Sequence, residues 1–283
     1  MEDKQKKTRK KKSKGGNTST ILIVVLIVAG LLVMLYPTIS NIYNEMTGSY
    51  AIQEFNEHLA DQSEEKLAEQ RRMAELYNSA LEKSLGNIDA DCPYEYEDIM
   101  DFGNGMMGYI EIPVIDVYLP VYHGVDESVL SKGVGHIPKT AFPIGGVGNH
   151  SVLTGHTGLP SAELFTDLEE MKEGDMFYVH IAGDVVAYEV DQILVVLPEE
   201  VDGIMPTAGE DYCTLVTCTP YGINSHRLLV RGHQVEIEAV EEVVAEVEEP
   251  EDYSIIIGIV TGAVSVLVIL VVLYCIIRKK SKK

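Results

Sequence analysis

The chain has 283 residues, of which 46% are hydrophobic and 23% charged, and its formal net charge is -22 at pH 7. This length and composition indicate one globular domain of ordinary size with attached segments, and they exclude a largely disordered chain. The acidic balance argues against a nucleic-acid partner, because contact with phosphates requires a basic surface.

The chain opens with a basic tail, residues 1–17, and an apolar stretch, residues 18–40. The tail carries eight Lys or Arg residues within its first 14 positions. Ile21 to Tyr36 are uncharged, and with their neighbours they reach the roughly 20 residues that a helix needs to cross a bilayer. Because no small-x-small cleavage site follows closely, we predict an uncleaved transmembrane anchor, with a cleaved signal peptide as the alternative.

Residues 41–86 are predicted to form a helical membrane-proximal segment. They are rich in Glu, Ala, Leu, Gln and Lys and contain no Pro. Apolar residues repeat at helical spacing on two faces: Ile52, Phe55 and Leu59 on the first, and Met73, Leu76, Tyr77, Ala80 and Leu81 on the second. Gly48 and Ser63 allow breaks, so we expect one or two helices that lead from the membrane to the main domain.

A loop at residues 87–107 precedes a region of short β segments, residues 108–237, in which Val, Ile and Tyr alternate with polar residues. The predicted strands are residues 109–112, 117–122, 151–154, 176–181, 185–190, 192–196, 212–217, 228–230 and 234–237. About eight strands with one short helix, at residues 162–168, predict a mainly β fold. We expect a closed or nearly closed barrel, because closure removes exposed strand edges.

The C-terminal part consists of an acidic tether at residues 238–253, an apolar span at 254–277 and a basic tail at 278–283. The span is uncharged over 24 residues from Ser254 to Ile277, which is long enough to cross a membrane. Both apolar stretches have Lys or Arg on their outer side. The positive-inside rule therefore predicts that both termini are cytoplasmic and that the region between the spans is extracellular.

The predicted external region contains three cysteines, Cys92, Cys213 and Cys218, while Cys275 falls in the second span. An odd number leaves at least one external thiol without an intramolecular partner. Cys92 and Cys213 either form a bridge or stay free, and we favour free thiols with Cys213 in the core and Cys92 exposed. Neither a Cys-x-x-Cys nor a His-x-x-x-His spacing occurs, so the sequence predicts no metal and no cofactor.

Cys218 comes directly after the predicted strand at 212–217 and is followed by the turn Thr219-Pro220-Tyr221-Gly222, a placement that presents its sulfur at a barrel rim. Cys213, five residues earlier, is expected on the opposite side of the strand. A nucleophilic thiol needs a nearby base or cation and a donor for the oxyanion that forms on attack. Arg227 on the following strand and His156 after another strand end are candidates for these roles, although each residue alone is more often structural.

Three blocks of the chain resemble the sortase family. The first, similar to its active-site strand and loop, is Thr214-Leu215-Val216-Thr217-Cys218-Thr219-Pro220-Tyr221-Gly222 and continues to Gly232. The other two are Leu153-Thr154-Gly155-His156, similar to the catalytic His segment, and Gly108-Tyr109-Ile110-Glu111-Ile112-Pro113, similar to the opening strand. The resemblance covers residues 85–237 and implies a sortase-type β-barrel with His156, Cys218 and Arg227 as its catalytic residues.

Within the family, the chain most resembles the pilin-polymerising, class C sortases, whose second transmembrane segment after the barrel matches residues 254–277. Many of them cover the active site with a lid built on Asp-Pro-aromatic. Here the loop reads Asp91-Cys92-Pro93-Tyr94, with a Cys inserted, so Asp91, Pro93 and Tyr94 are candidate lid residues. Thr157 also stands where the family often has a basic residue.

The resemblance implies a cysteine transpeptidase of the membrane of a Gram-positive cell. Its expected partners are surface proteins, pilin subunits above all, with a Leu-Pro-x-Thr-Gly-like signal. Cleavage between Thr and Gly would form a thioester on Cys218, and the acyl group would pass to a pilin Lys. The alternatives are a wall-anchoring sortase that uses a cell-wall precursor amine, and an inactive membrane-tethered scaffold.

Overall fold

The computed structural model describes residues 16–84, 92–103, 105–203 and 210–236, together with Gly258 and Gly262. The chain divides into two compact units, residues 38–251 on the one hand and residues 1–37 with 252–283 on the other. The predicted segments that lie outside the described residues are positions 1–15 of the basic tail, residues 87–91 of the predicted loop, the tether at 238–253, nearly all of the second span at 254–277 and the tail at 278–283.

Helix α1, Gly16–Ala60, contains the predicted anchor. Within the described residues, its stretch Val25–Ala60 is long and apolar enough to cross a membrane, a property that a signal sequence shares. Of the one or two helices expected after the anchor, the structure has two: α1 ends at Ala60 and α2 is Glu64–Ser84, with Ser63, one of the two suggested breaks, between them. The suggested break at Gly48 is wrong, because buried Gly48 packs against Pro120 within an unbroken helix.

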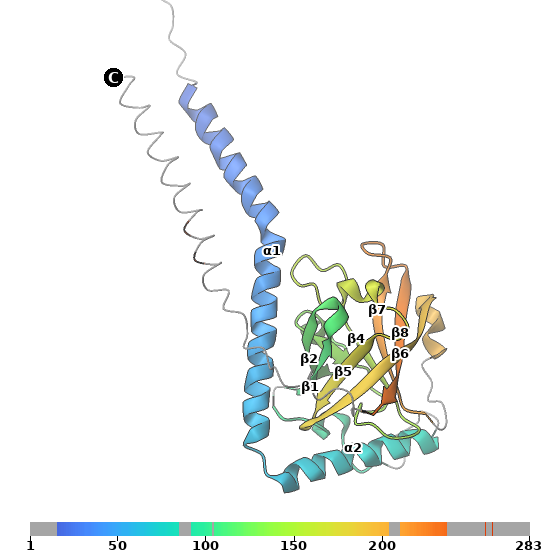
Figure 1. The fold of residues 1–283 in the computed structure, drawn as a ribbon. Helices are drawn as coiled ribbons and strands as arrows, with labels where there is room; N and C mark the ends of the chain where they lie inside the picture. The colour runs from blue at the N-terminus through green and yellow to red at the C-terminus, as the bar shows by residue number, and fades with distance from the viewer. Residues whose placement is uncertain are drawn as a thin grey trace, which may run out of the picture. The chain divides into compact units, whose positions relative to one another are not determined.

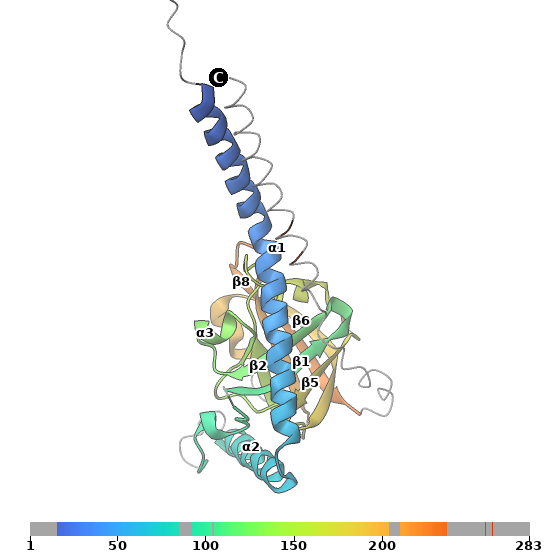
Figure 2. The same cartoon turned by 90° about the vertical axis from the view of Figure 1, so that its left-hand side faces the viewer.

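Both helices bury one face against the domain that follows. In α1, Ile52 and Phe55 are buried, as their spacing predicts. In α2, Tyr77 is buried and Leu76 is exposed, so the predicted apolar face is correct except at Leu76. Figures 1 and 2 show the part of α1 after Pro37 alongside the strands and α2 across one end of them.

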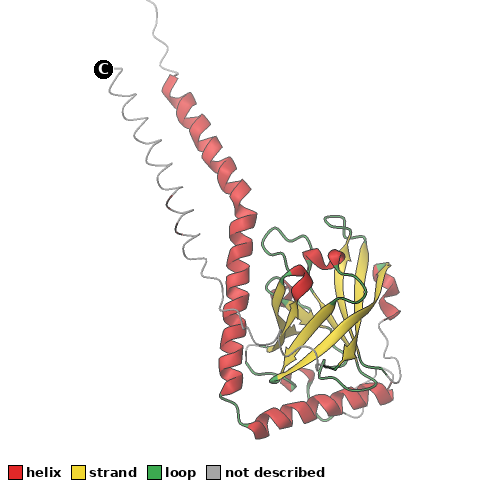
Figure 3. Cartoon of the chain, in the orientation of Figure 1, coloured by secondary structure: helices red, strands yellow, loops and turns green. Residues whose placement is uncertain are grey.

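Eight strands form a closed barrel, as the sequence predicts, in the order β1-β2-β3-β4-β7-β8-β6-β5 (Figures 1 and 3). The strands are β1 Met106–Ile112, β2 Val117–His123, β3 Val134–His136, β4 His150–Thr154, β5 Met176–Ile181, β6 Asp184–Val196, β7 Tyr212–Thr219 and β8 His226–Val235. The β2–β3 and β4–β7 pairs are parallel, and the other pairs are antiparallel. Short helical segments lie between them: η2 Tyr96–Asp98, η3 Pro113–Ile115, α3 Glu127–Leu130, η4 Thr166–Glu170 and η5 Pro198–Gly203.

Three sequence-based predictions within the barrel are wrong. Strand β3 was not predicted, because three residues with a central Gly carry no readable alternation. β6 and β8 are each one long strand instead of two. A bulge at Asp191 interrupts the pattern of β6 without ending its pairing to β8, and residues 231–233 interrupt the apolar pattern of β8 while they stay paired. The helix predicted at 162–168 is instead a loop that leads into the 3-10 turn η4, and Leu164 has a φ of 47° that no helix accommodates.

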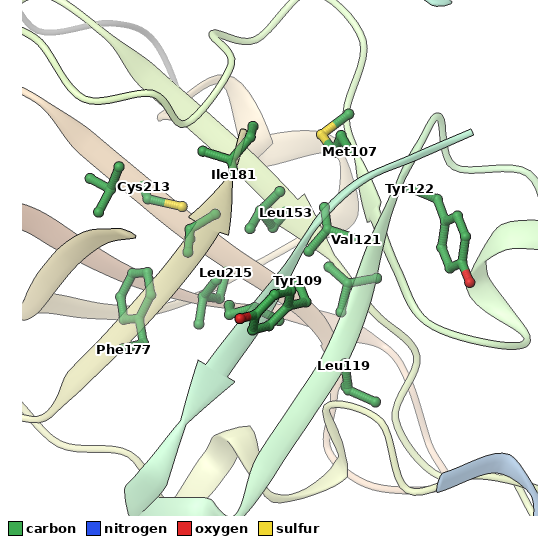
Figure 4. Close-up of a cluster of buried hydrophobic side chains, with 14 of the residues drawn as sticks. Met107, Tyr109, Leu119, Val121, Tyr122, Leu153, Phe177, Ile181, Cys213 and Leu215 are labelled. Atoms are coloured by element: carbon green, nitrogen blue, oxygen red, sulfur yellow. The ribbon is translucent and has the colours of Figure 1, made fainter. Parts of the chain in front are cut away.

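The barrel interior holds the main hydrophobic core, and the opposite face of three strands holds a smaller one. Cys213 and Leu215 of β7 point into the main core, where Figure 4 shows Cys213 near Ile181 and Leu153. Val216 of β7 instead packs with Val152 of β4 and Leu229 of β8 in the smaller cluster. Side chains alternate between the two faces of a strand, so the outer face of β4, β7 and β8 carries an apolar cluster of its own.

The segment 92–103 is attached to the barrel by Tyr96. Its hydroxyl lies 2.8 Å from Nδ1 of His136, and its ring stacks on the His136 ring at 5.7 Å. His136 is fully buried, and burial lowers its pKa to about 4. The neutral imidazole therefore holds the middle of the predicted loop at residues 87–107 against β3.

Candidate active site

The register of three neighbouring strands sets the candidate site. In the antiparallel β7–β8 pair, Cys218 lies directly opposite Arg227. In the parallel β4–β7 pair, Thr154 is level with Val216, so His156, two residues later, is level with Cys218. Sequence segments far apart thus bring one Cys, one Arg and one His to the same end of the barrel.

Hydrogen bonds extend this alignment beyond the end of β4. The Gly155 amide donates to the carbonyl of Val216 over 3.1 Å, and the Thr217 hydroxyl donates to the carbonyl of Gly155 over 2.8 Å. A side chain at position 155 has no room, because its Cβ would lie 2.8 Å from a ring carbon of Phe165. This glycine therefore lets the segment that carries His156 run against β7.

Two of the three side chains, those of Cys218 and Arg227, also share one face. Val216 and Leu229 belong to the outer apolar cluster, and Cys218 and Arg227 each lie two residues from one of them. Because alternate residues of a strand face the same way, Cys218 and Arg227 project on the outer face, directly beyond that cluster. The prediction that Cys213 points to the opposite side from Cys218 is confirmed.

Cys218 is half-buried and forms no disulfide, and Cys92 and Cys213 are also free thiols. The predicted alternative of a Cys92–Cys213 bridge is thus not formed, although Cys92 is half-buried and not exposed as expected. Burial raises the pKa of the Cys213 thiol well above its ordinary value, and the nearby Asp211 carboxylate adds to the effect. Of the two thiols of β7, Cys218 alone has access to solvent.

His156 contacts a carboxylate that sequence reasoning missed. Its Nε2 lies 3.3 Å from Oε2 of Glu127, the first residue of α3. The His156 side chain is 27% exposed and that of Glu127 is 78% exposed, so solvent screens this pair. No signal in the sequence distinguishes Glu127 from the other acidic residues, because the contact joins positions 29 residues apart.

Arg227 is held by backbone carbonyls and keeps its charge available. One terminal nitrogen donates to the carbonyl of His226 over 3.0 Å and to that of Asn224 over 3.4 Å. Within the described part of the chain, Arg227 forms no ion pair, whereas Arg231 on the same strand makes a two-pronged pair with Asp191. A guanidinium without a carboxylate partner can bind an acyl carbonyl and the negative charge that develops on it.

The loops after His156 and Cys218 touch each other. A Cβ at Gly158 would lie 3.3 Å from a ring carbon of Tyr221. Tyr221 and Ile223, in the turn after Cys218, are 62% and 71% exposed. Two apolar side chains therefore stand in solvent beside Cys218.

The candidate lid residues are only partly described. Asp91 lies outside the described residues, Pro93 is exposed and Tyr94 is half-buried against the main core. Among the described residues, no group of three or more His, Cys, Asp or Glu side chains could hold a metal ion. Thr157, the residue after His156, is buried.

A sortase domain model matches residues 110–235 of the chain. Among solved structures, the chain is similar to a sortase C of Streptococcus pneumoniae, with 41% identity, a TM-score of 0.60, and coverage of 66% of this chain and 97% of that one. It is also similar to sortase C of Clostridium perfringens in a structure with the C-terminal cell wall sorting motif, with 40% identity, a TM-score of 0.60, and coverage of 66% and 98%. The matches therefore include nearly the whole of both structures.

Curated relatives are more distant. Sortase A of Streptococcus agalactiae is 34% identical over 117 residues, which cover 40% of this chain and 47% of that protein. Sortase A of Bacillus anthracis is 30% identical over 130 residues, covering 46% of this chain and 60% of that protein. The chain thus spans between about half and three fifths of the length of these two relatives.

Proposed function

The chain belongs to the sortase family, and from this premise we propose that it is a cysteine transpeptidase with Cys218 as its nucleophile. The observation that carries the proposal is the register of β4, β7 and β8, in which Cys218 faces Arg227 and is level with His156. A reactive thiol requires these two kinds of partner, a proton carrier and a cation at the developing oxyanion.

In the first half-reaction, the Cys218 thiolate attacks the Thr carbonyl of a Leu-Pro-x-Thr-Gly-like signal. The C–S bond forms, the carbonyl oxygen becomes an oxyanion, and the Arg227 guanidinium stabilises it. The Thr–Gly C–N bond then breaks, and the His156 imidazolium gives its proton to the departing Gly amine. A thioester on Cys218 and a neutral His156 remain.

In the second half-reaction, an amine attacks the thioester carbonyl. His156 takes the proton that the amine loses, the new C–N bond forms, and Cys218 leaves as a thiolate. The cycle balances without a cofactor. Outward-facing Tyr221 and Ile223 offer apolar surface beside the thioester, which favours a peptide-borne amine over water as the acceptor.

We propose that this acceptor is a Lys of a pilin subunit. The similar structures support this choice, because they are sortase C proteins, and the pneumococcal structure is described in terms of pilin substrate specificity. The predicted second membrane span, residues 254–277, supports it as well. A wall-anchoring enzyme that uses a cell-wall precursor amine is the second candidate, favoured by the similarity to sortase A proteins.

The chain is proposed to act at the cell membrane of a Gram-positive cell with both termini cytoplasmic and the barrel outside. The apolar part of α1 supports the first of the two spans. We also propose that Asp91, Pro93 and Tyr94 belong to a lid over Cys218, supported by the attachment of this segment to β3 through Tyr96.

The experiment supplies the full chain, in detergent, with a fluorescent Leu-Pro-x-Thr-Gly peptide and two competing acceptors, a Lys-containing pilin peptide and a cell-wall precursor amine. We expect an acyl adduct on Cys218 by mass spectrometry and transfer mainly to the Lys peptide. Transfer mainly to the precursor amine would make it a wall-anchoring enzyme. If Cys218→Ala matches the wild type, or no signal peptide acylates the wild type, the transpeptidase proposal fails and the inactive scaffold is left.

A further inference from the structure

His156 is positioned by two segments that are not strands of the barrel. One is the loop that follows it, in which the Phe165 amide donates to the carbonyl of His156 over 3.0 Å. The other is α3, which carries Glu127 to within 3.3 Å of the imidazole. Neither segment is part of a strand ladder; Phe165 and Leu168 anchor the loop in the main core, and Val129 packs α3 against it.

Helix α1 contacts both segments. Oδ1 of Asn41 accepts a hydrogen bond from the Glu163 amide in the loop after His156, over 2.8 Å. Nδ2 of Asn44 donates to the carbonyl of Ser131 over 3.3 Å, and Ser131 is the residue that caps the C-terminal end of α3. All of these residues lie in the unit of residues 38–251.

The chemistry of position 41 requires an amide. Nδ2 of Asn41 donates to Oε1 of Glu45 over 2.7 Å, while its Oδ1 faces the Glu163 amide. A carboxylate can only accept and a backbone N–H can only donate, so the two neighbours fix the orientation of the Asn41 side chain. Position 41 therefore needs both the acceptor Oδ1 and the donor Nδ2 of an amide side chain.

The same face of α1 continues into the buried packing of the helix. Asn41, Asn44 and Gly48 follow one another at spacings of three and four residues, which places them on one side of a helix. Gly48 is buried next to Pro120 of β2, and Ile52 farther along is 1% exposed. The apolar part of this face holds α1 on the barrel, and its polar part reaches the two segments around His156.

We propose that Asn41 and Asn44 are positioning residues for His156: they tie the loop after it and α3 to α1, and so fix the imidazole relative to Cys218. This inference rests on the proposed transpeptidase function. In acyl transfer, a displacement of about 1 Å in a catalytic group can cost as much as 100-fold in rate. Losing one of the two hydrogen bonds, from Asn41 or from Asn44, should lower the rate by less than 100-fold.

The test compares Asn41→Ala, Asn44→Ala and the double variant, each as the full chain in detergent. We expect kcat for peptide transfer to fall about 10-fold in Asn41→Ala and further in the double variant, with KM within about twofold and an altered pH profile of kcat. Gln53→Ala is the matched control, because the exposed Gln53 side chain bonds Glu57 within the same helix. It should equal the wild type.

A chemical exchange separates positioning from stability. Asn41→Asp keeps the acceptor for Glu163 but sets two carboxylates against each other, whereas Asn41→Asp combined with Glu45→Gln restores a donor and acceptor pair. The double exchange should recover kcat relative to Asn41→Asp, with Glu45→Gln alone as its reference. The inference is overturned if Asn41→Ala keeps the kcat of Gln53→Ala, or if activity follows the melting temperature alone and the exchange restores nothing.

A second readout does not need a sorting signal. The rate of alkylation of Cys218 by iodoacetamide, followed by mass spectrometry of the peptide that contains it, reports how His156 and Cys218 are paired. If the wild type transfers no peptide but Asn41→Ala changes the alkylation rate and Gln53→Ala does not, the proposed function fails and the positioning role stands. If none of the variants changes the alkylation rate, the positioning role fails.

Discussion

Strands β4, β7 and β8 present the same three residue types near both of their ends, yet the two ends differ in chemistry. At one end, the rim, these residues are His156, Cys218 and Arg227. At the opposite end of the same strands, called the far end, they are His150, Cys213 and Arg231. At the rim, Cys218 is half-buried and Arg227 binds backbone carbonyls. At the far end, Cys213 is fully buried.

Partners separate the two ends as much as burial does. The Asp191 carboxylate accepts hydrogen bonds from two guanidinium nitrogens of Arg231, and this pairing raises the pKa of Arg231 above its ordinary value. The Arg231 guanidinium also lies 4.2 Å from the centre of the Tyr212 ring. His150 bonds the Thr214 hydroxyl over 2.7 Å. Residue type alone thus does not make a site: the groups must also be accessible and keep bonding capacity for a substrate.

The largest expected difference lies between the two thiols. Cys218→Ala should reduce acyl transfer by at least about 1,000-fold, because it removes the proposed nucleophile. Cys213→Ala should leave transfer within about threefold and lower the free energy of unfolding by about 1 kcal/mol, because it leaves a small cavity in the core. Peptide transfer and urea unfolding of both variants test this, and equal loss of activity would break the comparison between the two ends.

The two arginines should differ by a smaller factor. Arg227→Gln removes the cation that we propose to stabilise the oxyanion, so kcat should fall by about 100-fold with little change in stability. Arg231→Gln breaks a half-exposed pair with Asp191 and should instead cost about 1 kcal/mol of stability at unchanged kcat. Steady-state kinetics and thermal unfolding measure both, and a slow but fully stable Arg231→Gln variant would contradict the assignment.

Two buried groups outside the candidate site, Asp211 just before β7 and His136 at the end of β3, should control how stability depends on pH. Burial raises the pKa of Asp211 to about 7, so the folded chain binds the extra proton and stability falls as pH rises from about 4 to 7. Burial lowers the pKa of His136 to about 4 from 6.5, so its contribution rises with pH from about 4 to 6.5. Between about pH 4 and 6.5, the two effects on the free energy of unfolding therefore cancel.

Replacing Asp211 should therefore expose the slope of His136. In Asp211→Asn, the free energy of unfolding should rise by about 1.4 kcal/mol per pH unit between pH 4.5 and 6, where the wild type is nearly flat. The variant should also be more stable than the wild type above pH 7. Urea titrations at several pH values measure this, and parallel curves for the two proteins would refute the charge state assigned to Asp211.

The barrel was predictable from the sequence because most of its strands have a recognisable local residue pattern. Alternating Val, Ile and Tyr marks most strands, and strand-end turns mark where Cys218 and His156 stand. The short β3 was missed because its residues bear no pattern, and β6 was split because a bulge at Asp191 interrupts the alternation. Local periodicity therefore gives the architecture but not its irregularities.

The contacts around His156 were not predictable in the same way. Glu127 reaches His156 across 29 residues, and Asn41 reaches Glu163 across 122 residues. Neither belongs to a motif, and each contact depends on how loops and a helix close over a finished barrel. Such residues become visible only when the fold places them, whereas the Cys, Arg and His are marked by the strands that carry them.

The smallest expected effect concerns Glu127, the carboxylate that lies next to His156 at the rim. Glu127→Gln keeps the shape of the side chain and removes its charge next to His156. Because the Glu127 side chain is 78% exposed, we expect kcat to fall only about threefold at low salt. At about 0.5 M salt the wild type and the variant should converge, since screening is then effective over a few Å. Transfer rates at both salt concentrations measure this, with Thr214→Val as the far-end control that should lose stability but not rate. A threefold loss that persists at high salt would mean that Glu127 acts through a short-range, charge-assisted hydrogen bond to His156, which the neutral Gln side chain does not match and which salt does not screen.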